Sequence, residues 1–444
     1  MIRALRSIFL TRRFFVAGWA LVLFFVLGWA YAPVLVAAKL AALGLGIALL
    51  AELFLLYGPR SGLKGARRTY DRWSNGDHNP VRIELESSYG TTMRVRLLDE
   101  LPHQFQKRDL EFNGRMEAWA KTGFHYQVRP VARGVYRYGA INAMVSSPLG
   151  LMERRFALDA DKEVAVYPSY LQLRKYELLA ISNRLTLAGV KRIRRVAHQS
   201  EFERIKEYVP GDDRRTVNWK ATARRARLMV NQYQDEKAQQ VFSLIDTGRV
   251  MKMPFEELSL LDYAINASLV ISSVAMRKED RAGLLTFSSK PHDFVRASRQ
   301  RGHMQHILQA LYAQGTDHKE TDFEALYVAV RRELHQRSLL LLFTNYESVQ
   351  AMHRQLPYLQ RLARQHLVVP IFFLNTELDA DLRHLPMNTE EVYVRAIAEK
   401  MTHEKRLIAR ELERHGLPAI LCRPQDLTVS VINRYLEIKA RGML

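Results

Sequence analysis

Two long apolar runs lie close together near the N-terminus and limit what the rest of the chain can fold into. Residues 14–31 carry no charge, and residues 34–57 carry only Lys39 and Glu52. Each run is long enough to cross a bilayer as a helix. We therefore expect residues 1–60 to form a membrane anchor with two transmembrane helices, at about 14–31 and 34–57, that contacts membrane lipids.

Basic residues flank this pair of runs on its two outer sides. Four arginines lie within residues 1–13 and a Lys/Arg cluster occupies residues 60–68, whereas only Ala32-Pro33 separates the runs. Because Lys and Arg accumulate on the cytoplasmic side, both termini and the large domains are expected in the cytoplasm. A signal peptide cleaved after residues 30–32 is the alternative. The length of the first run and the second run directly behind it favour two membrane spans.

Residues 61–170 have the pattern of a β-rich, sandwich-like domain. Residues 81–86 and 93–97 alternate between apolar and polar side chains, which is typical of half-buried strands. Short segments punctuated by Gly, Pro and Asn follow, and 147–150 (Ser-Pro-Leu-Gly) is a turn signal. Nothing in this block has the pattern of a catalytic site.

Residues 171–237 form a basic connecting region. Within 171–230 there are 15 Lys and Arg against 6 Asp and Glu, and Lys191–Arg195 is the densest cluster. A solvated or membrane-proximal face is the simplest interpretation, and binding of an acidic partner, a lipid surface or nucleic acid are the alternatives. The net charge of the whole chain is +20, which suits any of these. Because no nucleic-acid-binding motif accompanies the charge, no specific nucleic acid is expected.

One segment of this region, Tyr208–Arg224, combines a turn with an aromatic residue among cations. Proline and glycine in 210–213 (Pro-Gly-Asp-Asp) are the residues that tight turns require. Trp219 lies in sequence beside Lys220 and Arg224, a composition suited to stacking of guanidinium on indole. The alternative is a structural turn that packs one aromatic side chain.

Residues 238–444 alternate between strand-like and helix-like segments and predict one α/β domain. The strands are expected at 241–246, 283–287, 292–297, 339–344, 366–374 and 419–422. Helices are expected at about 258–278, 300–314, 321–335 and 389–415, with one more at the C-terminus. Continuous apolar strands are typical of a parallel sheet covered on both faces. The pattern predicts a doubly wound sheet, whose ligands bind at the carboxyl ends of the strands.

The segment around Trp219 resembles the bacterial domain of unknown function 58 family over residues 200–290. The resemblance is carried by Tyr208, Pro210, Gly211, Asp212, Arg215, Asn218, Trp219, Ala223, Arg224 and Asp246. It implies a multi-domain protein of the bacterial inner membrane, in which a transmembrane helical hairpin and a β-sandwich-like domain precede a von Willebrand factor A-like α/β domain. It also implies a MoxR-type AAA+ ATPase as partner, and an interaction role for the motif residues.

The resemblance also indicates where a metal would bind. In von Willebrand A domains a divalent ion is held by Asp-x-Ser-x-Ser after the first strand, a threonine on a later loop and a later aspartate. The corresponding positions here are Asp246 with Gly248 and Val250, Thr321, and Asn345. One carboxylate, one hydroxyl and one amide make a poor cage for a hard cation. We expect no cofactor, and a bound divalent metal such as Mg²⁺ is the alternative.

The sequence therefore predicts a non-enzymatic membrane scaffold with no catalytic residue, whose α/β domain presents a docking surface. Phosphate-binding loops and nucleophile elbows are absent from the sequence. One alternative is a metal-dependent hydrolase or transferase using Asp212, Asp213 and Asp246. The other is a binder of nucleic acid or an anionic surface through Lys191–Arg195, with steeply salt-dependent affinity.

Overall fold

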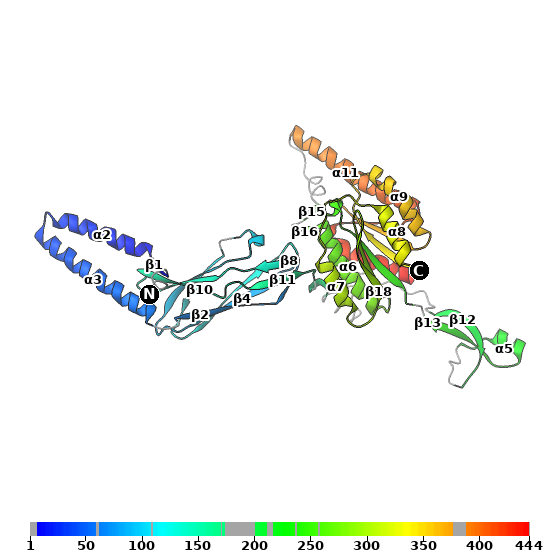
Figure 1. Cartoon of the computed structure of the whole chain (residues 1–444), viewed down its shortest axis with the longest axis horizontal. Coiled ribbons are helices and arrows are strands. Elements are labelled where there is room, and N and C mark those ends of the chain that lie inside the picture. Colours follow the sequence, from blue (N-terminus) through cyan, green and yellow to red (C-terminus); the bar gives the residue numbers. More distant parts are fainter. Residues whose placement is uncertain are drawn as a thin grey trace. The chain divides into compact units, whose positions relative to one another are not determined.

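The computed structural model divides into two compact units, Met1–Tyr167 and Pro168–Leu444 (Figure 1). It describes residues 7–58, 62–107, 110–169, 171–173, 200–210, 216–235, 238–255, 258–375 and 388–443. The predicted organisation into several domains with several β-sheets is therefore present.

Two helices lie side by side in the first unit, α2 (Arg12–Gly28) and α3 (Ala32–Tyr57) (Figure 1). Pro33 lies in the first turn of α3, where its missing N–H costs nothing. The first helix ends at Gly28 and not near residue 31. Gly28 is required by close packing, since an added Cβ would lie 2.9 Å from the Leu35 backbone.

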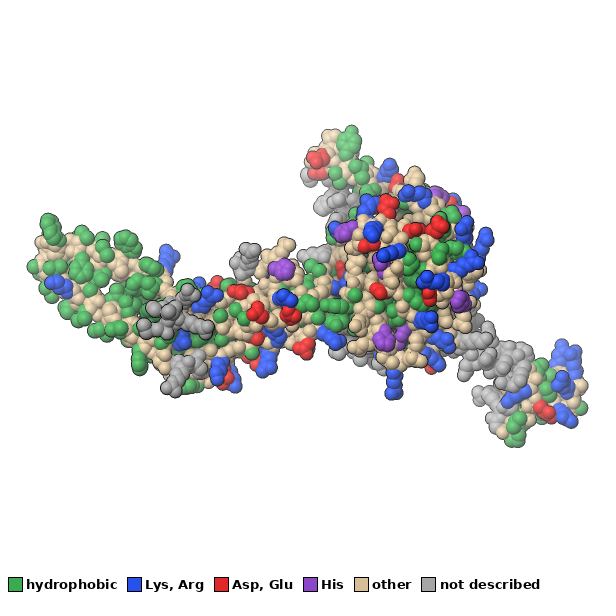
Figure 2. Space-filling view, viewed as in Figure 1, with side chains coloured by type: hydrophobic (Ala, Val, Ile, Leu, Met, Phe, Trp, Pro, Cys, Tyr) green, Lys and Arg blue, Asp and Glu red, His purple; other side chains and the backbone are tan. Residues whose placement is uncertain are grey.

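The surfaces of both helices are largely apolar and exposed, as Figure 2 shows for the end of the chain that holds them. Among the described residues, α3 alone passes the length and composition that a membrane-crossing helix needs. The helix α2, with 17 residues, is shorter than that length.

Strands in three sheets form the rest of the first unit. A five-stranded sheet has the order β1-β10-β9-β5-β6. Its strands are β1 (Ile8–Leu10), β10 (Met152–Leu158), β9 (Ile141–Ser146), β5 (Met93–Asp99) and β6 (Glu111–Met116). A second sheet joins β2 (Leu63–Thr69), β4 (Asn79–Ser87) and β7 (Lys121–Val128), and a third joins β3 (Arg72–Ser74), β11 (Glu163–Tyr167) and β8 (Gly134–Arg137).

The core of this unit is built from alternate residues of strands in two of the sheets. Ile83 and Leu85 of β4 are buried together with Val95 and Leu97 of β5. The period of two seen in the sequence is therefore the burial pattern, and the strands predicted at 81–86 and 93–97 are confirmed. No sequence pattern predicted β1, which pairs antiparallel with β10 just before α2 begins.

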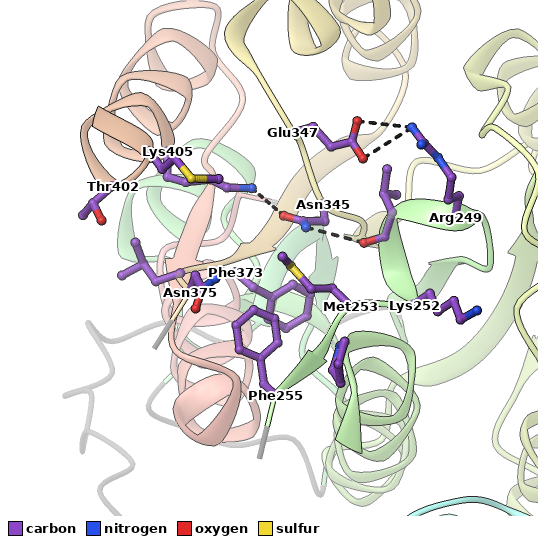
Figure 3. Close-up of a pocket in the computed structure, with 14 residues that line it drawn as sticks. Arg249, Lys252, Met253, Phe255, Asn345, Glu347, Phe373, Asn375, Thr402 and Lys405 are labelled. Atoms are coloured by element: carbon purple, nitrogen blue, oxygen red, sulfur yellow. Dashed lines mark hydrogen bonds and ion pairs between the residues drawn. The ribbon is translucent and has the colours of Figure 1, made fainter. Parts of the chain in front are cut away.

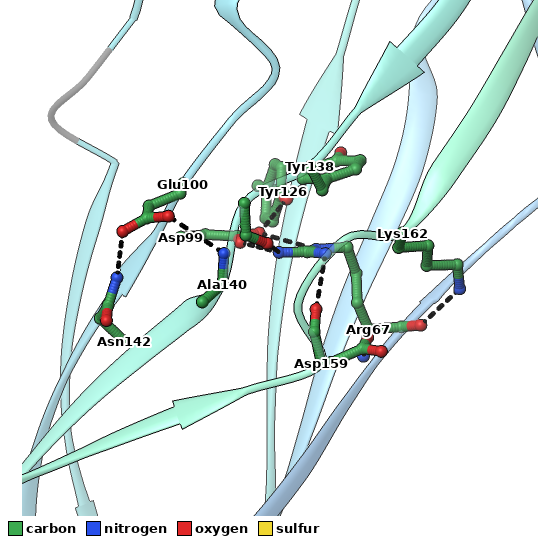
Figure 4. Close-up of polar contacts among 10 residues, drawn as sticks. Arg67, Asp99, Glu100, Tyr126, Tyr138, Ala140, Asn142, Asp159 and Lys162 are labelled. Atoms are coloured by element: carbon green, nitrogen blue, oxygen red, sulfur yellow. Dashed lines mark hydrogen bonds and ion pairs between the residues drawn. The ribbon is translucent and has the colours of Figure 1, made fainter.

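A buried ion pair crosses the same unit (Figure 4). The guanidinium of Arg67 donates to the carboxylate of Asp99, and both side chains are fully buried. Tyr126 donates a hydrogen bond to Asp99, and the ring of Tyr138 lies 3.9 Å from the Arg67 guanidinium carbon. Two charges without water need such additional partners, because their mutual attraction alone does not offset the loss of hydration.

The second unit contains a six-stranded sheet with the order β18-β17-β14-β19-β20-β21. The strands are β14 (Gln240–Asp246), β17 (Arg281–Phe287), β18 (Pro291–Ser298), β19 (Leu339–Phe343), β20 (Leu367–Phe373) and β21 (Ile420–Cys422). All neighbours are parallel except β18, which is antiparallel to β17. The helices are α6 (Leu260–Arg277), α7 (His303–Tyr312), α8 (Phe323–Glu333), α9 (Val349–Ala363), α11 (Thr389–Arg414) and α12 (Leu427–Ala440).

Each face of this sheet has its own apolar core. Val241 and Ile245 of β14 pack with α6, α7 and α12, whereas Phe242 and Leu244 pack with α8, α9 and α11. Successive strand residues point to opposite faces, so a continuously apolar strand needs cover on both sides. A short hairpin, β15 (Pro254–Phe255) and β16 (Leu258–Ser259), precedes α6.

The order of the strands fixes where a site can form. From β14 the chain moves first to β17 and β18, and then returns to β19 on the other side of β14. The direction therefore reverses between β14 and β19. In open α/β sheets, ligands bind in the crevice at the carboxyl ends of the strands beside such a reversal. Asp246 and Thr344 lie at the carboxyl ends of these two strands.

Candidate functional site

Asp246, at the end of β14, lies at the centre of a buried set of hydrogen bonds. Its Oδ1 accepts from the Thr321 hydroxyl at 2.7 Å and from the Gly248 N–H at 2.8 Å. Its Oδ2 accepts from the Thr344 hydroxyl at 2.7 Å. The side chain is fully buried. The carboxylate therefore ties together the ends of two strands and the loop before α8.

The environment of Asp246 weakens its charge. Burial raises the pKa of its carboxyl to about 6, against the opposing effect of the hydrogen bonds from Thr321, Thr344 and Gly248. The carboxyl is therefore half protonated near pH 6, and both of its oxygens already accept hydrogen bonds. Such a group has a structural role and is not an open metal ligand. Asp246 accepts from the Gly248 N–H two residues later and so caps its own loop.

The predicted metal-binding positions are only partly brought together. Thr321 does meet Asp246, but the Asn345 amide turns to other partners. A side chain at Gly248, the position of a motif serine, would place its Cβ 2.3 Å from the Thr321 hydroxyl oxygen. The direct contact between Thr321 and Asp246 therefore occupies the space that a serine would need. No cluster of three or more His, Cys, Asp or Glu suited to a metal occurs among the described residues.

A pocket of about 700 Å³ lies beside this buried cluster, at the carboxyl ends of β14, β19 and β20 (Figure 3). Its apolar lining comes from Val250, Met253, Pro254, Phe255, Phe373, Leu374 and Met401. The polar lining is Arg249, Lys252, Asn345, Glu347, Asn375, Thr402 and Lys405. Pockets of this size, mostly apolar with a few convergent polar groups, are typical of ligand sites.

Lys405 is the polar group that sequence reasoning missed. Its ammonium donates to Asn345 Oδ1 at 2.7 Å and to the backbone oxygen of Tyr346 (Figure 3). Burial lowers the pKa of Lys405 to about 8, although the nearby carboxylates Glu347 and Glu404 oppose the shift. Arg249, at the rim, pairs with Glu347 at 3.4 Å, so its charge is partly matched within the protein.

A separate substructure of the second unit carries Trp219. It consists of β12 (Ser200–Glu207), β13 (Met229–Asp235) and the short helix α5 (Trp219–Arg225), and we call it the Trp219 arm. The two strands are antiparallel. The backbone N–H of Tyr208 donates to Leu228 at 2.8 Å and closes the hairpin beyond β12.

Asn218 fixes the helix of the Trp219 arm to its strands. The Asn218 side-chain oxygen accepts from the Ala221 N–H at 3.0 Å, which caps α5, and its amide donates to Asn231 at 2.9 Å. The backbone N–H of Asn218 also donates to Met229 at 2.9 Å. These bonds explain the asparagine of the motif, because an N-cap side chain satisfies a helix donor that would otherwise lack a partner.

The indole of Trp219 is 73% exposed, although its helix is held firmly in place. Exposed cations follow it along α5 and the next turn: Lys220, Arg224, Arg225 and Arg227. Figure 2 shows these Lys and Arg side chains gathered on the Trp219 arm. Of these four cations, only Arg227 forms an ion pair within the described part of the arm. Its partner is Glu207, at 3.4 Å.

The remaining motif residues divide between this arm and the segments outside the described residues. Pro210 is exposed at the end of the hairpin. Gly211, Asp212, Asp213 and Arg215 lie outside the described residues, as does the basic cluster Lys191–Arg195. Tyr208, Pro210, Asn218, Trp219 and Arg224 are therefore the predicted interaction residues that the structure describes.

Comparison with known proteins matches most of the Trp219 arm and the part of the pocket lining that precedes residue 388. The family described as "Protein of unknown function DUF58" matches residues 204–387. The "Uncharacterized protein YeaD" of Bacillus subtilis (strain 168) is 24% identical over 270 residues, which cover 59% of this chain and 65% of that protein's length.

Solved structures give weaker likenesses. The conserved hypothetical protein BatB from Bacteroides thetaiotaomicron is 11% identical and aligns with 46% of this chain and all of that chain, with a TM-score of 0.31. The CARDB domain of the PF1109 protein from Pyrococcus furiosus is 14% identical over 23% of this chain and 91% of that chain, with a TM-score of 0.18. Across residues 204–387, from the Trp219 arm into the parallel sheet, the chain is thus similar to the DUF58 family.

Proposed function

We propose that this protein is a non-enzymatic, membrane-anchored scaffold that binds a partner protein through the Trp219 arm. The observation that carries the proposal is the 73% exposure of Trp219 on a helix whose first turn is capped and tied to β13. Tryptophan and arginine are the residues that most often dominate binding energy at protein interfaces. The hydrogen bonds that hold α5 to β13 also reduce the ordering cost that a loose segment would incur on binding.

The first unit supports the anchoring part of the proposal. Both α2 and α3 present apolar side chains outward, and the residues before α2 form a strand of the same unit to which α3 returns. On this proposal α2 and α3 both span the bilayer, and because they start and end at one β domain, that domain and the N-terminus lie on a single side of the membrane. With the basic flanks, this side is the cytoplasm of a bacterium, and the membrane is its inner membrane.

The second unit supports a binding role for the α/β domain. Its strand order and the position of Asp246 fit the von Willebrand A-like fold that the sequence resemblance implies. In such a domain a metal would need open ligands, whereas both oxygens of Asp246 already accept hydrogen bonds. This arrangement favours a scaffold over a metal-dependent hydrolase or transferase.

The chemistry of the Trp219 arm specifies the kind of partner. Exposed Lys220, Arg224 and Arg225 around an apolar ring suit an acidic protein surface with an apolar recess. The family resemblance identifies a MoxR-type AAA+ ATPase as the expected partner. A membrane anchor together with a docking arm for such an ATPase suits an assembly role. The anchor would fix the site at the membrane where the ATPase acts.

Affinity purification of the tagged full-length protein in detergent with ATP, followed by mass spectrometry, tests this proposal. Wild type is expected to recover a AAA+ ATPase, and Trp219→Ala is expected to lose most of it. Trp119→Ala is the matched control, because Trp119 is 70% exposed but lies in the first unit. Equal recovery of the ATPase by wild type and Trp219→Ala, or no ATPase with any variant, would contradict the proposal.

One alternative has a specific observation behind it. A tryptophan among exposed arginines also suits an anionic lipid surface, where indole prefers the interface and cations meet acidic headgroups. Binding of the protein to vesicles that contain phosphatidylglycerol, lost in Trp219→Ala and absent with phosphatidylcholine, would favour this surface-binding role over the protein-binding one.

A further inference from the structure

The pocket beside Asn345 is separate from the Trp219 arm and has chemistry of its own. Its apolar lining includes two phenylalanines, Phe255 and Phe373, which lie near Met253 in Figure 3, and a second methionine, Met401. Such side chains accept flat or flexible apolar groups, because methionine adapts its shape and contacts aromatic rings favourably.

One charged group, the ammonium of Lys405, lines these walls, and Glu347 and Glu404 act on it only from beyond ion-pair distance. Lys405 comes from α11 and bonds two neutral oxygens, those of Asn345 and of the Tyr346 backbone. Among the described residues, no carboxylate lies within ion-pair distance of its ammonium. A partly buried ammonium without a direct ion-pair partner is costly to desolvate, and a ligand that brings a carboxylate would supply that partner.

The other charges at the pocket do not supply this match. Glu347 is turned toward Arg249 at the rim, with both side chains more than half exposed. An ion pair so exposed exchanges readily with water and contributes little. Thr402 and Asn345 line the pocket near Lys405 and can donate further hydrogen bonds to an oxygen anion.

We propose that this pocket binds a small carboxylate with an aryl or alkyl body, whose apolar part lies against Phe255 and Phe373 and whose carboxylate pairs with Lys405. The site uses a lysine from α11 in place of a metal ion, so binding needs no divalent cation. It lies outside the motif and the Trp219 arm, and it is a second binding function of the same domain.

Three water-soluble probes of one shape test the proposal: 4-phenylbutanoate, 4-phenylbutanol and 4-phenylbutylamine. Binding to the full-length protein in detergent is measured by saturation-transfer NMR, with protein-free detergent as the blank and EDTA present throughout. Wild type is expected to bind the carboxylate about tenfold more tightly than the alcohol, because a charge-assisted hydrogen bond in a desolvated site contributes about that much. The amine is expected to bind most weakly.

Variants of α11 assign the preference to Lys405. Lys405→Met is expected to abolish the preference for carboxylate over alcohol, and Lys405→Arg to keep it. Lys400→Met is the matched control on an exposed position of the same helix and is expected to behave as wild type. Met401→Glu, which places a like charge at a position 42% exposed, is expected to reverse the preference without disturbing the core.

The results decide the proposal whether or not each variant folds. Equal binding of carboxylate and alcohol by wild type overturns it. A preference that persists in Lys405→Met or Met401→Glu also overturns it. If Lys405→Met fails to fold, Lys405→Arg and Met401→Glu answer the same question. Recovery of the partner through the Trp219 arm is a separate measurement, so failure here leaves the proposed scaffold role untouched.

Discussion

The Ser147 hydroxyl donates a 2.5 Å hydrogen bond to Oε1 of Glu52, and so joins the end of α3 to a turn 95 residues further along the chain. The backbone N–H groups of Gly150, Leu151 and Met152 converge on the same carboxylate, at 3.0 to 3.2 Å. Such a concave set of backbone donors is a natural site for an anion. Here the anion belongs to the protein, and it fixes the apolar helix to the β domain.

Replacing Glu52 with Gln tests this junction. The amide group would turn two donors toward backbone N–H groups that need an acceptor, so buried donors would lose their partner. We expect the free energy of unfolding of the variant to fall by roughly 2–4 kcal/mol. Thermal unfolding of the full-length protein in detergent measures the change.

Glu111→Gln is the control for this prediction, because Glu111 is exposed at the edge strand β6. Its effect is expected to stay within about 0.5 kcal/mol. Equal stabilities of the two variants would show that the Glu52 junction contributes nothing to the fold.

The buried pair of Arg67 and Asp99 gives a second prediction. Asp99→Asn keeps the shape of the side chain but leaves the guanidinium of Arg67 without a counter-charge in the core. We expect a loss of about 3–5 kcal/mol in the free energy of unfolding, since an unmatched buried charge is expensive. The exposed pair Arg137–Glu163, at 2.6 Å, is the comparison. Glu163→Gln is expected to cost at most about 1 kcal/mol, and a similar loss in both variants would contradict the prediction.

Asp246 gives a prediction about pH. Burial raises its folded pKa to about 6 from an ordinary value of 3.8, so the folded state binds more protons than the unfolded state between these values. Stability from this group is therefore fully present below pH 4 and is lost as the pH rises through 6. Each pKa unit corresponds to about 1.4 kcal/mol, so the loss is about 3 kcal/mol.

The variant Asp246→Asn isolates that contribution, because asparagine does not titrate. Unfolding is compared at pH 4.5 and pH 7.5 for both proteins. The difference in the free energy of unfolding between wild type and Asp246→Asn is measured at each pH. This difference is expected to favour wild type more at pH 4.5 than at pH 7.5. Parallel pH profiles for the two proteins would mean that Asp246 titrates at an ordinary pKa.

Divalent cations give a fourth prediction from the same residue. The oxygens of Asp246 already accept from Thr321, Gly248 and Thr344, so Mg²⁺ would have to displace these donors. Adding 10 mM MgCl₂ after EDTA treatment, roughly a saturating concentration for a moderate site, is expected to leave the melting temperature unchanged. A rise that Asp246→Asn abolishes would instead establish a metal site.

Much of the secondary structure could be predicted because its sequence signal is local. The strand expected at 241–246 is β14, and the apolar run 339–344 is β19, since fully buried parallel strands must be continuously apolar. The long helix expected at 389–415 is α11. The strand expected at 292–297 is β18, although its antiparallel direction depends on a tight turn after β17 that periodicity does not report.

The polar contacts could not be predicted, because they join residues far apart in sequence. Lys405 meets Asn345 across 60 residues, and Glu52 meets Ser147 across 95. In the sequence Lys405 is one cation in a polar helix, and Glu52 is one charge near the end of an apolar run. The strand β1 was missed for a related reason, since its three residues were assigned to the flank of a membrane helix.

The Trp219 arm shows the opposite case, in which a motif was recognised but its geometry was not. Asn218 and Thr222 hold α5 to β13, and this makes Trp219 point outward. A sequence cannot distinguish an aromatic residue that packs a turn from one that a turn presents to solvent. The exposure of the indole is therefore the structural finding on which the scaffold proposal depends.

The most direct test of that proposal is the amount of AAA+ ATPase recovered per molecule of Trp219→Ala, measured together with its melting temperature. Because the indole is largely exposed, we expect the melting temperature to stay within a few degrees of wild type and the recovered ATPase to fall about tenfold or more. Trp119→Ala should match wild type in both. Full recovery of the ATPase by a folded Trp219→Ala protein would contradict the central claim that this arm is the docking surface.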